Sequence, residues 1–190
     1  MSTLELFKER FNQYQSGNGS SGLGTIRQNA FDAFNQMGIP TSRHEEWKYT
    51  RIGGVFKEKL QIPVGQASTS ISSPDLDALR MPGSDRANEL VFINGLFSFS
   101  LSSIRSAGLV VLSLEEAAGN EYKEIVLKHL GHSSNYLRDG INALNTAFLH
   151  GGVFIYAKRG LAVEHPIYIY NVVDGRSENI FAQPRSLVHA

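Results

Sequence analysis

The sequence predicts an α+β protein in which an N-terminal helical region precedes the start of a right-handed parallel β-helix. The runs Val153–Ala157 and Ile167–Val173 are rich in β-branched and aromatic residues, a composition typical of strands. The connector between them contains Gly160 and Pro166, which favour a turn. Short strands that keep turning in this way are typical of the rungs of a solenoid. No sequence repeat of fixed period accompanies them, so the solenoid prediction depends on strand length and turns alone.

Two helices are predicted at the N-terminus. Ser2 to Glu5 fit a capping box, and apolar residues follow at helical spacing as far as about Ser16. A second apolar stripe ends at Met37, and Gly38 is suited to the left-handed conformation that closes a helix.

The stretch between these helices contains a formal G-x-G-x-x-G at Gly17, Gly19 and Gly22. A dinucleotide site of this kind needs a strand before the glycines and a parallel βαβ unit around them. Because a helix precedes them here, we interpret the stretch as a helix–helix linker.

The segment Thr41–Thr50, TSRHEEWKYT, has the densest group of informative side chains. A zincin motif is excluded because Lys48 stands where the second histidine would be. Adjacent carboxylates point in different directions, so they do not form a catalytic pair. We favour the interpretation that Trp47 and Tyr49 anchor the segment on the core, and an interaction surface is the alternative. The candidate interaction or anchor residues are Arg43, Glu45, Glu46, Trp47, Lys48 and Tyr49.

The remaining elements are predicted from local patterns. The region 52–83 has the composition of irregular surface chain, with a short helix near Asp75–Leu79. His129 and His132 flank Gly131 at a helix end, where a favourable helix-dipole interaction explains them better than metal ligation does.

Strands are predicted at Glu89–Phe97 with an Asn94-Gly95 turn, in the following FSFSLS, and at Leu109–Leu114, Asn179–Ala182 and Ser186–Ala190. Helices are predicted at Asn120–Leu130 and over the stripe Leu137, Ile141, Leu144 and Phe148. The predicted regions are 1–85 (helical and irregular), 86–150 (mixed, capping the solenoid) and 151–190 (first rungs).

Composition excludes several kinds of site. The 190 residues have a formal net charge of zero, which argues against nucleic-acid or membrane-surface binding. There is no cysteine, so thiolate catalysis and Cys-ligated metal sites are excluded. The N-terminus lacks a signal-peptide pattern and no apolar run approaches membrane-spanning length. We expect a cytoplasmic protein without a cofactor of its own and without catalytic or metal-binding residues.

Several separated strings resemble the N-terminal half of the SufB/SufD family of the SUF iron–sulfur cluster assembly system. They are PTSRHEEWKYT, ELVFINGLFSFSLS, DGINALNTAF and GGVFIYAKRGLAVEHPIYI, in that order. The EEWKYT-type string is closer to the SufD branch than to SufB. The resemblance implies a helical region, a central β-helix and a non-enzymatic scaffold that acts with SufB and the ATPase SufC.

Two alternatives stay open at this point: a β-helix polysaccharide lyase or hydrolase, and a generic protein-interaction module. The resemblance also implies that a longer family member would continue beyond Ala190, so we expect a truncated chain. The uncovered edges of Ile167–Val173 and Ser186–Ala190 would then favour self-association through the C-terminal strands.

Overall fold

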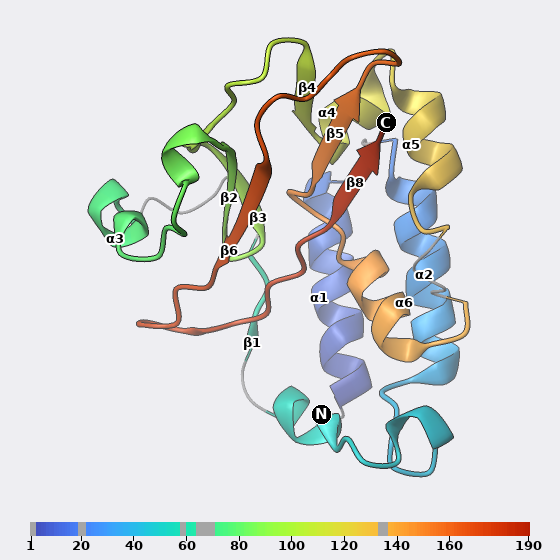
Figure 1. Ribbon diagram of the computed structural model, residues 1–190. Coiled ribbons are helices and arrows are strands. Elements are labelled where there is room, and N and C mark those ends of the chain that lie inside the picture. Colours follow the sequence, from blue (N-terminus) through green and yellow to red (C-terminus); the bar gives the residue numbers. More distant parts are fainter. Residues whose placement is uncertain (1–2, 19–21, 58–59, 64–70, 133–136) are drawn as a thin grey trace. The chain divides into compact units, whose positions relative to one another are not determined.

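The computed structural model describes residues 3–18, 22–57, 60–63, 71–132 and 137–190 (Figure 1). The chain forms two compact units, each built from two separate stretches of sequence. Unit 1 contains Met1–Ile62 and Ala118–Leu149, and unit 2 contains Pro63–Ala117 and His150–Ala190. The predicted regions 1–85, 86–150 and 151–190 are each continuous in the sequence, whereas each unit combines two separate stretches of it.

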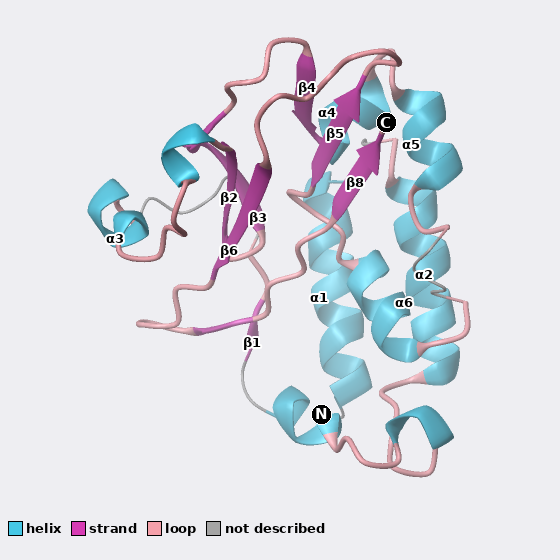
Figure 2. Ribbon diagram, viewed as in Figure 1, coloured by secondary structure: helices cyan, strands magenta, loops and turns pink. Residues whose placement is uncertain are grey.

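Unit 1 is mainly helical, as Figure 2 shows. The predicted end of the second helix is confirmed, because α2 ends at Met37 and the Gly38 N–H donates to the Phe34 carbonyl at 2.7 Å. The predicted left-handed helical conformation of Gly38 is wrong: its φ of +66° is combined with an extended ψ of −165°. The predicted Ser2 cap and Gly19 lie outside the described residues. The elements of unit 1 are α1 (Thr3–Asn18), α2 (Gly24–Met37), η1 (Glu45–Trp47), η2 (Ile52–Lys57), β1 (Leu60–Gln61), α5 (Lys123–His129) and α6 (Gly140–Ala147).

The core of unit 1 is an aromatic cluster around Phe148, which follows α6 directly. Its ring centroid lies 5.9 Å from that of Phe7, 5.8 Å from Phe11 and 6.4 Å from Phe31. The ring of Phe148 is 1% exposed, so these contacts are shielded from water. Aromatic pairs at such separations add to the stabilisation that burial of their area provides. The cluster therefore joins α1 and α2 to the end of α6.

Unit 2 contains two three-stranded sheets of mixed direction. In the first, β2 pairs antiparallel with β3 and parallel with β6; in the second, β5 pairs antiparallel with β4 and parallel with β8. Its elements are α3 (Ser73–Asp77), η3 (Ser84–Arg86), β2 (Asn88–Ile93), β3 (Leu96–Ser103), β4 (Leu109–Ser113), β5 (Val153–Ala157), β6 (Ile167–Val172), β7 (Asn179–Ile180) and β8 (Ser186–His189). Helix α4 (Leu114–Gly119) begins in unit 2 and ends in unit 1.

Apolar side chains from both sheets of unit 2 form one core. Its buried members are Leu90, Phe92, Phe97, Leu109, Val111, Val153 and Ile155. On the other face of the first sheet, Leu76 of α3 packs with Val91, Ile93 and Tyr170. Burial on both faces explains why the sequence of β2 is apolar without a clean alternation.

The predicted right-handed parallel β-helix is wrong. A solenoid needs strands that pair in parallel with the equivalent strand of the next rung, whereas each of the two three-stranded sheets contains an antiparallel pair and neither is closed or stacked as a solenoid. One cause is the turn at Asn94 and Gly95, whose φ angles of +54° and +85° reverse the chain into a hairpin. The strand composition was interpreted correctly, but it carries no information about pairing direction.

The C-terminal strands β6 and β8 lie at the edges of their sheets, so the predicted self-association through these strands stays a prediction. Within the part of the chain that the structure describes, β6 pairs only with β2 and β8 only with β5. The side chains of Ile169 and Val188 on these strands are 39% and 61% exposed. Exposed apolar edge strands are templates for pairing with a second chain.

We therefore expect the protein to self-associate, and we expect Val188→Lys to shift it toward monomer because a charge on an edge strand opposes pairing. Val163→Lys, in the loop before β6, is the matched control at a less exposed valine. Sedimentation velocity over a range of concentrations measures both. A wild-type protein that remains monomeric at its highest soluble concentration would contradict the prediction.

Candidate functional site

The candidate segment Thr41–Thr50 belongs to unit 1 and lies between α2 and η2. It is a series of tight turns: the Trp47 N–H donates to the His44 carbonyl at 2.9 Å, and the Thr50 N–H donates to the Trp47 carbonyl at 3.0 Å. Glu45 and Glu46 are both exposed to solvent.

The Trp47 side chain is hydrogen-bonded to a helix that lies far away in the sequence. Its indole Nε1–H donates to Asp139 Oδ2 at 3.0 Å. Asp139 is the N-cap of α6, because its Oδ1 accepts a hydrogen bond of 2.8 Å from the Asn142 N–H. One carboxylate thus caps the helix and holds the half-buried tryptophan, and a bond to a charged acceptor is stronger than one between neutral groups.

The other candidate residues lie on the surface. The Tyr49 side chain is 91% exposed, so the prediction that it anchors the segment on the core is wrong. Lys48 Nζ lies 5.6 Å from the centroid of the Tyr49 ring and 3.9 Å from Glu45 Oε1. Arg43 and Glu46 are exposed as well. Of the six candidate side chains, only that of Trp47 is hydrogen-bonded to another element within the described residues.

Two hollows flank the Trp47 side chain. The larger, of about 610 Å³, extends toward the end of α2 at Gly38, and the smaller, of about 470 Å³, extends along the start of α6 at Ile141. Both are lined by Glu46, Trp47, Arg138 and Asp139. Hollows of this size hold a small molecule or one or two side chains of a partner.

Asp139 and Arg138 were missed by reasoning from the sequence. The predicted helical stripe begins at Leu137, whereas the structure begins the helix at Gly140. An aspartate directly before an apolar helical stripe is an N-cap signal, so Asp139 could have been found. Its hydrogen bond to Trp47 could not have been predicted, because the two residues are 92 positions apart.

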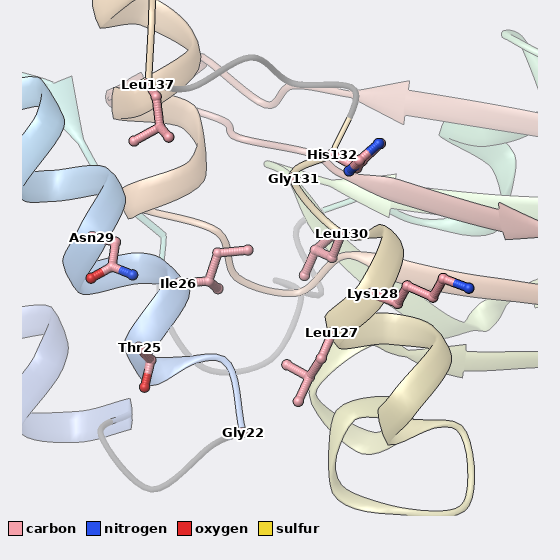
Figure 3. A pocket seen from close by; sticks show the side chains of 10 residues that line it. All are labelled: Gly22, Thr25, Ile26, Asn29, Leu127, Lys128, Leu130, Gly131, His132 and Leu137. Atoms are coloured by element: carbon pink, nitrogen blue, oxygen red, sulfur yellow. The ribbon is translucent and has the colours of Figure 1, made fainter.

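A third hollow, of about 670 Å³, lies between α2 and α5 (Figure 3). Ile26, Leu127 and Leu130 project into it, whereas Lys128 points away from α2. Gly22 at its rim is the last glycine of the G-x-G-x-x-G pattern, and it leads into α2 from a helix and not from a strand. The glycine pattern therefore lacks the preceding strand that a dinucleotide-binding site requires.

The predicted helix end near the two histidines is present, since Gly131 has φ +82°. Among the described residues, no group of three or more His, Asp or Glu side chains is placed to hold a metal ion. No helix within the same residues is long and apolar enough to span a membrane.

Comparison with known proteins identifies the family. A family model described as the SufBD protein N-terminal region matches residues 2–169 of the chain. A search of curated proteins finds no match. The match covers most of the chain, so the protein belongs to this family, and with it to the proteins of SUF iron–sulfur cluster assembly. The resemblance stated from the sequence is thereby confirmed at the level of the SufB/SufD family.

The anchoring role of Trp47 leads to a stability prediction. Trp47→Ala removes a half-buried ring and its bond to the Asp139 carboxylate, so we expect a loss of about 1–3 kcal/mol in the free energy of unfolding. Tyr49→Ala is the matched control, because an aromatic ring that is 91% exposed contributes little to the folded state. Urea unfolding followed by circular dichroism measures both. Equal stability of Trp47→Ala and the wild type would rule out the anchor.

Proposed function

We propose that the protein is a SufD-like scaffold component of the SUF system, acting with SufB and the ATPase SufC. The observation that carries the proposal is the match of the SufBD N-terminal family over residues 2–169. The EEWKYT-type string, which includes the candidate residues from Glu45 to Tyr49, supports the SufD branch. A cytoplasmic location is part of the same proposal.

The chemistry of the chain is consistent with a non-enzymatic role. With no cysteine in the sequence, the chain cannot hold an iron–sulfur cluster through thiolates of its own. The carboxylates of the candidate segment are exposed, and its one tryptophan is hydrogen-bonded to the N-cap of α6. We propose that the chain carries no cofactor, and that sulfur delivery and ATP hydrolysis belong to its partners. The polysaccharide-hydrolase alternative has lost its support, because it required the β-helix.

An affinity-tagged copy of the protein, purified from its own cells, tests the proposal. We expect SufB and SufC among the co-purified proteins, at levels well above those in an untagged control, when the eluate is quantified by mass spectrometry. Anaerobic incubation of the purified chain with iron and sulfide, followed by desalting, is expected to leave no visible chromophore. Absence of both partners from the eluate would contradict the scaffold role, and a retained stoichiometric cluster would contradict the cofactor-free role.

A further inference from the structure

The hollows beside Trp47 have no part in the proposed scaffold role, although they combine an aromatic ring with charged side chains at the surface. Glu46 and Arg138 each line both hollows. Both side chains are exposed, and neither makes an ion pair or a side-chain hydrogen bond within the described residues. Two opposite charges that line the same hollow without pairing leave their hydrogen-bonding groups to an incoming partner.

The charge of the lining favours a cationic partner. Glu45, Glu46 and Asp139 place three carboxylates around the larger hollow, against the single guanidinium of Arg138. Asp139 accepts hydrogen bonds from the Trp47 indole and from the first turn of α6, and Glu45 lies 3.9 Å from Lys48 Nζ. The carboxylate of Glu46 retains its full charge for a ligand.

The aromatic rings favour the same sign of charge. The face of an indole ring is electron-rich, and it attracts a cation and repels an anion. The segment already contains one example of this arrangement, because Lys48 Nζ lies 5.6 Å from the Tyr49 ring centroid and close to the Glu45 carboxylate. A cation that enters either hollow would lie among the residues that line it, which include Trp47 and Glu46.

We propose that the hollow beside Trp47 binds an arginine side chain from a basic segment of a partner protein. A planar guanidinium stacks on an aromatic ring and donates paired hydrogen bonds to a carboxylate, whereas the ammonium of lysine acts as a point charge. Arginine and tryptophan are both enriched among the residues of binding hot spots. The binding site does not depend on the SUF role, so each proposal can fail without the other.

Trp47 reports on this site directly, because it is the only tryptophan in the chain. Its emission is titrated with acetyl-tetraarginine amide, acetyl-tetralysine amide and acetyl-tetraglutamate amide at low salt, using the intact protein. We expect a saturable change with tetraarginine, weaker binding of tetralysine and no saturation with tetraglutamate. We expect Glu46→Gln to raise the Kd for tetraarginine about twofold to fivefold, since one exposed charge pair is lost.

Glu124→Gln is the matched control, because Glu124 is an exposed carboxylate of α5 that does not line the hollows beside Trp47. It removes the same net charge and is expected to leave the Kd nearly unchanged. Thermal melts of both variants confirm that they are folded. Saturable binding of tetraglutamate would assign the site to Arg138 and overturn the proposal. Equal Kd values for the two variants, equal affinity for tetralysine and tetraarginine, or no saturation with tetraarginine would overturn it too.

Discussion

The helical unit depends on one backbone carbonyl, that of Leu149. It accepts a hydrogen bond of 2.7 Å from the Tyr14 hydroxyl on α1 and another of 2.7 Å from Arg27 Nε on α2. Arg27 is fully buried, and its guanidinium lies 5.4 Å from the centroid of the Tyr14 ring. A buried charge is tolerated only where it is well bonded, so these contacts constrain three separate segments of chain at one point. The aromatic cluster around Phe148, the preceding residue, forms beside them.

This constraint extends to the candidate site. Fixing the end of α6 also fixes its start, where Gly140 approaches the Gly38 carbonyl so closely that a Cβ at position 140 would collide with it. Asp139 at the same end holds Trp47, so the indole and the hollows beside it depend on the placement of α6. The surface that we assign to a basic partner is therefore preorganised by the core and not by the segment itself.

Local patterns in the sequence were sufficient for part of this architecture. The end of α2 at Gly38 and the Asn94-Gly95 hairpin were predicted because glycine and asparagine adopt positive φ more readily than other residues. The pairing of β2 with β6 and of β5 with β8 was not predicted, since it joins residues far apart in the sequence. The burial of Arg27 was not predicted either, because arginine between apolar residues of a helix is usually solvent-exposed. In the candidate site, the sequence identified Trp47 and its neighbours but not Asp139.

A double-mutant cycle at the Leu149 carbonyl tests the central claim most directly. Tyr14→Phe, Arg27→Met and the double variant are unfolded in urea, with the emission of Trp47 as the signal. Because both side chains share one acceptor and touch each other, we predict that their effects on the free energy of unfolding are coupled by at least about 0.5 kcal/mol. We also predict that Tyr14→Phe alone destabilises the protein by about 0.5–1.5 kcal/mol. Additive effects, or an unchanged stability of Tyr14→Phe, would show that this carbonyl does not hold the unit together.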